Sequence, residues 1–142
     1  MSKFVSITGV GALVAAAALL AGGGSALAVD LKVNLTGADE VPPVTTSASG
    51  TGTVTVAPDK SVSGSIKTSG LEATMAHIHV GAPGNNGPVI LTLNKGADGT
   101  WSVPPGSKLT DEQYAKFKAG ELYVNIHSTE HKSGELRAQL KP

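Results

Sequence analysis

Cysteine is absent from the 142-residue sequence. The chain therefore forms no disulfide and no thiolate metal site, and it has no cysteine nucleophile. Its formal net charge is zero, and no basic patch of the kind that binds nucleic acid or anionic lipid stands out. Stability must come from core packing, from hydrogen bonds within sheets or from a bound ligand.

Recognisable catalytic motifs are also missing. No Ser-His-Asp arrangement has a familiar local context, and the acidic residues are too scattered to nominate a pair of the glycosidase type. The glycines at 50, 52 and 64 lie in strand patterns without a following helix, so they do not form phosphate loops. These absences leave catalysis open and favour a binding role.

The N-terminal segment is typical of a secretory signal peptide. Lys3 precedes a long apolar run that ends near Leu20, and Ala26-Leu27-Ala28 fits the small-x-small pattern of a cleavage site. We expect residues 1–28 to be removed and residues 29–142 to reach the periplasm or the medium. A membrane anchor is the alternative, but the apolar run is short for a bilayer span, so we expect no membrane span in the mature form.

The mature part alternates short runs rich in Gly, Thr, Ser and Val with turn signals, which is typical of antiparallel sheets. We predict one all-β domain over 29–142, an antiparallel Greek-key, immunoglobulin-like β-sandwich with one short helix at 111–119. Thr110 and Gln113 provide a capping box for that helix, and Gly120 ends it. The predicted strands are 29–36, 50–57, 61–69, 73–80, 88–94, 99–103, 121–128 and 134–141.

The four histidines fall in two clusters. Side chains two apart on a strand share a face, so His77 and His79 lie on one face together with Met75. His127 takes the corresponding outward position in the strand 121–128, and His131 follows in a hairpin loop. The opposite faces of these two strands are apolar and should be buried in the core, as should apolar residues of the last strand. The predicted core residues are Ile78, Val80, Leu122, Val124, Ile126, Leu136 and Leu140.

These positions predict a metal site. His-x-His on a strand places two imidazoles at chelating distance, and His127 from another strand could complete a trigonal set. Met75 would be a weak axial ligand, and His131 is the weakest candidate. Imidazoles suit zinc, copper, iron and nickel, whereas the thioether favours copper(I), so we expect copper or, failing that, another transition metal. Alternatively, the histidines are hydrogen-bonded residues of a surface or half-buried polar face.

Arg137 is the only arginine in the chain. It shares the outer face of the last predicted strand with Glu135. We interpret it as one half of a structural ion pair, with Glu40 or Glu135 as the partner. Trp101 is solitary, and we expect it to pack in the core.

At several points the sequence resembles the CHRD domain, a module named for its occurrence in chordin and common in bacterial exported proteins. The resemblance implies a β-sandwich, and it implies no reaction. It covers nearly the whole mature chain in the right order. The matching segments are Glu40-Val41-Pro42-Pro43, Ala76-His77-Ile78-His79-Val80-Gly81, Gly87-Pro88-Val89, Leu109-Thr110, Gly120-Glu121-Leu122-Tyr123-Val124-Asn125-Ile126-His127 and Gly134-Glu135-Leu136-Arg137.

The His-x-His pair, a later histidine and a late arginine also look like the copper half of copper/zinc superoxide dismutase, although the bridging histidine, the zinc ligands and the disulfide have no counterpart. Three functions therefore stay open. The leading hypothesis is an exported copper-binding protein for storage, delivery or sequestration. The second is a metal-free structural module whose Tyr-Asn-His face and loop 81–87 contact a protein or a glycan. The third is a copper redox enzyme of the dismutase type.

Overall fold

The strands and the helix of the computed structural model, which describes residues 26–142, follow the predicted segments closely. Residues 1–25 of the predicted signal peptide lie outside the described residues. In chain order the elements are β1 (Val29–Leu35), β2 (Ser49–Val56), β3 (Val62–Ser69), β4 (Ala73–Val80), β5 (Val89–Thr92), β6 (Asn94–Lys95), β7 (Thr100–Ser102), α1 (Asp111–Lys118), β8 (Leu122–Ser128) and β9 (Leu136–Leu140).

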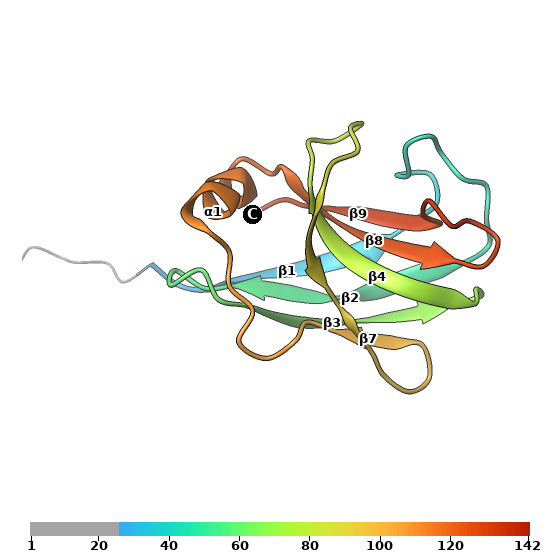
Figure 1. Cartoon of the computed structure of the whole chain (residues 1–142), viewed down its shortest axis with the longest axis horizontal. Coiled ribbons are helices and arrows are strands. Elements are labelled where there is room, and N and C mark those ends of the chain that lie inside the picture. The colour runs from blue at the N-terminus through green and yellow to red at the C-terminus, as the bar shows by residue number, and fades with distance from the viewer. Residues whose placement is uncertain (1–25) are drawn as a thin grey trace, which may run out of the picture.

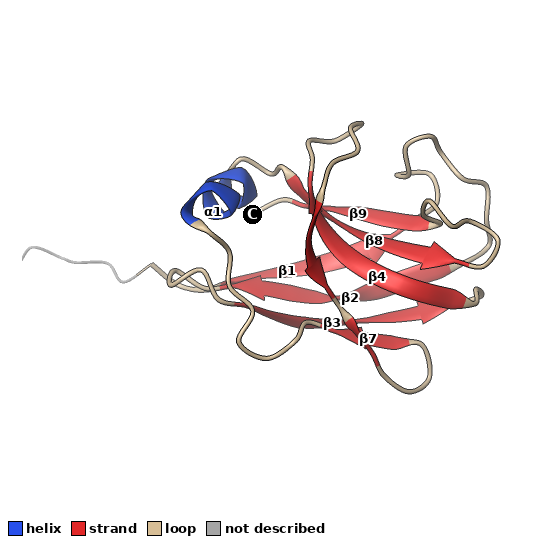
Figure 2. Cartoon of the chain, in the orientation of Figure 1, coloured by secondary structure: helices blue, strands red, loops and turns tan. Residues whose placement is uncertain are grey.

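Two antiparallel sheets form a sandwich (Figure 1). The first has the strand order β1-β2-β3-β7-β6, and the second has the order β5-β4-β8-β9. Figure 2 shows strands in both layers of the sandwich and the helix α1 at one end of it. The predicted all-β sandwich with one short helix is confirmed.

The core lies between the two sheets and consists of side chains that alternate along each strand. Val54 and Ile66 of the first sheet and Val124 and Ile126 of the second are at most 1% exposed. Six of the seven predicted core residues are buried, but Val80 is only partly buried. It is the last residue of β4, at the end of the sheet, where it borders a shallow hollow beside α1.

The predicted strand 88–94 is in fact two strands in different sheets. β5 pairs with β4 in the second sheet, whereas β6 pairs with β7 in the first. Leu93 lies between them, is 3% exposed and donates its backbone N–H to the carbonyl of Ala76. The chain therefore crosses from one sheet to the other at a buried leucine, a break that an uninterrupted apolar run does not reveal.

The single described helix begins and ends as its sequence predicts. The Thr110 side chain accepts the backbone N–H of Gln113, and the Gln113 side chain accepts the backbone N–H of Thr110, which confirms the capping box. Phe117 anchors the helix in the core, and Gly120 follows its C-cap with a φ of 74°. Within residues 26–142 no helix is long and apolar enough to cross a membrane.

Two loops cover the outer face of the second sheet. The loop after β1 and the loop after β4 both rise on the side of β8 and β9 that faces away from the first sheet (Figure 1). The Asn86 side chain of the second loop donates to the carbonyl of Val41 in the first, at 2.8 Å. As a result β8 is buried along its entire length, on its polar face as well as on its apolar face.

Candidate metal centre

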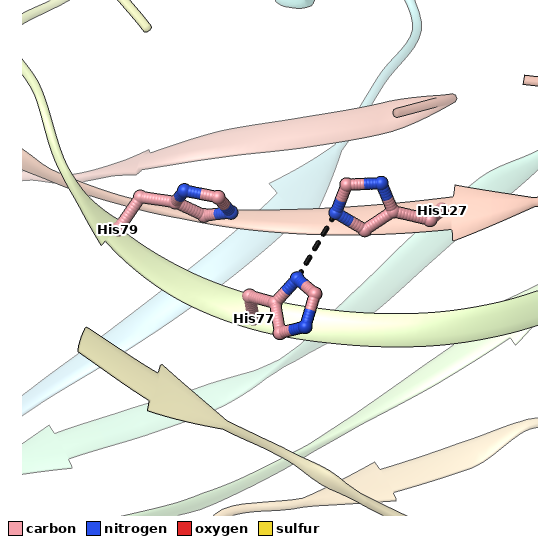
Figure 3. A group of neighbouring side chains, drawn as sticks. All are labelled: His77, His79 and His127. Carbon is pink, nitrogen blue, oxygen red and sulfur yellow. Dashed lines mark hydrogen bonds between the residues drawn. The ribbon is translucent and has the colours of Figure 1, made fainter. Parts of the chain in front are cut away.

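The antiparallel register of β4 and β8 brings three histidines together. His77 pairs with Asn125, His79 with Tyr123 and Met75 with His127, so all these side chains occupy the outer face of the second sheet. One ring nitrogen from each of His77, His79 and His127 lies within 4.8 Å of the others. Figure 3 shows the three rings converging from the two strands, with His77 Nδ1 3.0 Å from His127 Nε2. The structure thus brings together three of the five predicted ligands, and the binding of an ion by them stays a prediction.

Backbone carbonyls hold two of the rings in one orientation. His79 Nδ1 donates to the carbonyl of Gly87 at 2.9 Å, and His127 Nδ1 donates to the carbonyl of Lys132 at 2.8 Å. A carbonyl can only accept, so each neutral ring carries its proton on Nδ1 and a lone pair on Nε2. Metal-binding histidines are usually oriented in this way by the nitrogen that does not bind the metal.

His79 Nε2 is the ring nitrogen of the cluster that is buried without a hydrogen bond to any described residue. The residue is 8% exposed, and Nε2 has no hydrogen-bond partner among the described residues. His127 Nε2, by contrast, is within hydrogen-bond distance of His77 Nδ1. His77 is only partly buried, so the cluster opens toward solvent on its side.

Electrostatics keep the His77 and His79 rings neutral. Burial lowers the pKa of His77, and the neighbouring His127 and His79 rings lower it further. Burial also lowers the pKa of His79; the hydrogen bond to Gly87 opposes this change, while His127 and Arg137 add to it. Both rings are therefore neutral at neutral pH, and each has one N–H and one nitrogen lone pair.

The spacing fits a metal with small side-chain adjustments. Imidazole nitrogens lie about 2.0 Å from such an ion, so three of them around one ion are about 3.3–3.5 Å apart. The His77–His127 pair, at 3.0 Å, would open slightly, and a nitrogen at the upper limit of 4.8 Å would move inward. Because His127 Nε2 accepts the hydrogen bond from His77 Nδ1, binding an ion through His77 Nδ1 would also require the His77 proton to move to Nε2. The donor set consists of three neutral imidazoles.

An aromatic and cationic stack supports His79 from the side of β8. The His79 and Tyr123 rings are parallel within 4°, with centroids 4.7 Å apart. The central carbon of the Arg137 guanidinium lies 3.6 Å from the centroid of the Tyr123 ring. The Tyr123 hydroxyl accepts the backbone N–H of Gly87 at 3.0 Å, which helps to fix the carbonyl that orients His79.

Comparison with known proteins places this architecture in a family. Residues 31–140 match the sequence model of the CHRD domain, from β1 to β9. The chain belongs to the CHRD domain family. No curated protein and no solved structure matches it. The matched segment of this CHRD domain includes both histidine strands and the two loops above them.

Arg137 of the CHRD domain does not form the expected ion pair. Within residues 26–142 no carboxylate lies within 4.0 Å of its guanidinium nitrogens. The residue is 1% exposed, and the loop after β4 wraps around it. Its partners are neutral groups: the carbonyls of Ala82 and Asn85 and the side chains of Asn86 and Gln139.

Glu40 is buried, and the positive charge of Arg137 acts on its carboxyl group. The side-chain hydrogen bond of Glu40, however, is with Asn125 rather than with Arg137. Burial raises the pKa of Glu40 from 4.5 to about 7, and the positive charge of Arg137 opposes that rise. Glu135, the other expected partner, accepts hydrogen bonds from Ser128 and Thr46 instead. The two carboxyls thus join different polar groups beneath the loops.

Of the remaining two predicted ligands, Met75 borders the three converging rings and His131 lies away from them. Met75 occupies the position opposite His127, at the edge of the cluster, and is 48% exposed. His131 does not join the cluster, because β8 ends at Ser128 and strand alternation does not extend into the turn that follows. The His131 ring lies instead beside Glu130 and Glu135, with Nε2 3.8 Å from a Glu135 oxygen.

Sequence reasoning missed the groups that orient the rings. The carbonyls of Gly87 and Lys132 carry no side-chain signal, and only the folded loops bring them to the histidines. The predicted Tyr-Asn-His interaction face is not available as a surface, because Tyr123 and Asn125 are each 3% exposed. A partner of this CHRD domain would contact the covering loops rather than that face.

Proposed function

We propose that this CHRD domain is an exported protein that binds one copper ion through His77, His79 and His127. The observation that carries the proposal is the buried Nε2 of His79, which faces the other rings without a partner while its Nδ1 is held by a carbonyl. A buried polar atom without a partner destabilises a fold by about 1–3 kcal/mol. A metal bond at Nε2 would compensate for that loss.

Copper is favoured by the chemistry around the rings. Imidazole also suits zinc, iron and nickel, but a thioether selects for copper(I). Met75 lies opposite His127 on the open side of the cluster and is half exposed. It would serve as a weak ligand, or as the first contact for an ion that enters beside His77. Storage, delivery or sequestration all fit such an accessible site.

Export rests on the predicted signal peptide. The expected cleavage site, after Ala28, immediately precedes β1, which begins at Val29. Leu27 is 84% exposed and makes no contribution to the core. Cleavage after Ala28 would therefore leave every residue of β1 in the mature chain. A periplasmic or secreted location also suits a metal-binding protein without cysteine.

The test is a competition titration of copper(I), against a chromogenic chelator, into the metal-free exported protein. We expect one equivalent to bind, and we expect His79→Ala to weaken binding by at least about 100-fold, because even outer partners of ligands contribute 10–100-fold. His131→Ala is the matched control, since that ring lies outside the cluster, and it should bind like wild type. Equal binding by wild type and His79→Ala would refute the proposal.

A further inference from the structure

We infer that the three-histidine site prefers copper(I) to divalent ions, and that Arg137 sets this preference from outside the coordination sphere, through the stack with Tyr123 and His79. The inference rests on the proposed function, since it concerns the ion that the same rings bind. Arg137 would be a positioning residue that does not contact the ion. Its charge alone would change the relative affinity of the site for the two kinds of ion.

The strand order aligns the three members of the stack. Tyr123 on β8 lies between His79 on β4 and Arg137 on β9. The guanidinium is 3.6 Å from the centroid of the Tyr123 ring, which is in turn 4.7 Å from the centroid of the His79 ring. The charge is therefore no farther from the His79 ring than these two distances together.

The charge of Arg137 is permanent and poorly screened. A guanidinium does not lose its proton in proteins, and this one is 1% exposed. All four of its hydrogen-bond partners are neutral carbonyl or amide groups. The nearby Glu40 carboxyl interacts with this charge, and the raised pKa of Glu40, about 7, leaves that carboxyl only partly ionised at neutral pH.

Such an environment penalises a divalent ion more than a monovalent one. Three neutral imidazoles cancel none of the ion's charge, and the desolvation energy of a buried ion grows with the square of that charge. Repulsion from Arg137 adds a further term proportional to the charge. At an effective dielectric constant of about 20 and a separation of about 10 Å, one extra unit of charge changes the relative affinity by on the order of tenfold.

The experiment measures the affinities of copper(I) and zinc(II) for the exported protein, each by competition with a chelator. Zinc(II) is divalent, binds imidazole and has no redox chemistry. We expect Arg137→Gln to shift the ratio of the two affinities toward zinc(II) by about tenfold, and Arg137→Lys, which keeps the charge, to shift it far less. Loss of geometry affects both ions, so the ratio isolates the charge.

Glu40→Gln provides a second variant that does not disturb Arg137's partners. At pH 8, where Glu40 is mostly ionised, its removal should shift the ratio in the opposite direction, toward copper(I). If Arg137→Gln does not fold, as judged by circular dichroism, Glu40→Gln decides alone. If neither folded variant changes the ratio of the two affinities, the inference is overturned. That result would leave the proposed copper binding unaffected. Wild type that binds neither ion refutes the proposed function itself.

Discussion

Glu40 offers a test of the polar layer beneath the loops. Its side chain is 6% exposed and accepts a hydrogen bond from Asn125, and burial raises its pKa from 4.5 to about 7 despite the nearby charge of Arg137. Replacing Glu40 with Gln keeps the size and the acceptor oxygen but removes the titration. The variant should therefore lose one component of the pH dependence of the free energy of unfolding.

The sign follows from proton binding. Between pH 4.5 and about 7 the folded protein keeps the Glu40 proton and the unfolded chain does not, so this component of stability falls as pH rises through that window. At 1.36 kcal/mol for each pH unit, the total is up to about 3 kcal/mol. His77 and His79 act in the opposite sense, because their lowered pKa values reduce stability as pH falls below 6.5.

The assay is urea denaturation of metal-free wild type and Glu40→Gln at a series of pH values from 4.5 to 8. Both proteins share the histidines, so the difference between their curves isolates Glu40. We expect the variant to gain on wild type by up to about 3 kcal/mol as pH rises through the window. Glu72→Gln, at an exposed position, is the matched control and should follow wild type. Parallel curves for wild type and Glu40→Gln would refute the reasoning.

Three further predictions concern the loop, the stack and export. A methyl group in Gly87→Ala would collide with the carbonyl of Val80, so this variant should displace the carbonyl that orients His79 and weaken copper binding in a chelator competition; binding unchanged from wild type would contradict it. Tyr123→Phe removes the acceptor for the Gly87 N–H and should lower the free energy of unfolding by about 1 kcal/mol in urea; equal stability would show that this hydrogen bond is unimportant. N-terminal sequencing of the exported protein should begin at Val29, and an intact Met1 would exclude cleavage.

The sequence predicted the structure correctly where strand alternation alone determines which way a side chain points. Strict alternation in 73–80 and 121–128 predicts both histidine strands, and antiparallel pairing then brings His77, His79 and His127 together. The capping box of α1 is equally local, because Thr110 and Gln113 satisfy each other's backbone groups. The strands and the capping box are predicted from neighbouring residues alone, whereas the pairing of β4 with β8 joins His77 and His127, which are 50 positions apart in the chain.

The features that sequence reasoning missed all depend on long-range contacts. Arg137 was expected to pair with a carboxylate, yet a loop more than fifty residues away in the chain supplies carbonyls that surround it. The split at Leu93 depends on which sheet each half of an apolar run joins.

X-ray absorption at the copper edge of the copper(I)-loaded protein tests the central proposal most directly. We predict a spectrum of imidazole nitrogens about 2.0 Å from the ion. The variant in which His77, His79 and His127 are all replaced by Ala should retain no copper at that site, whereas His131→Ala should give the wild-type spectrum. Copper retained by the triple variant with an unchanged spectrum would contradict the assignment of the site to these three histidines.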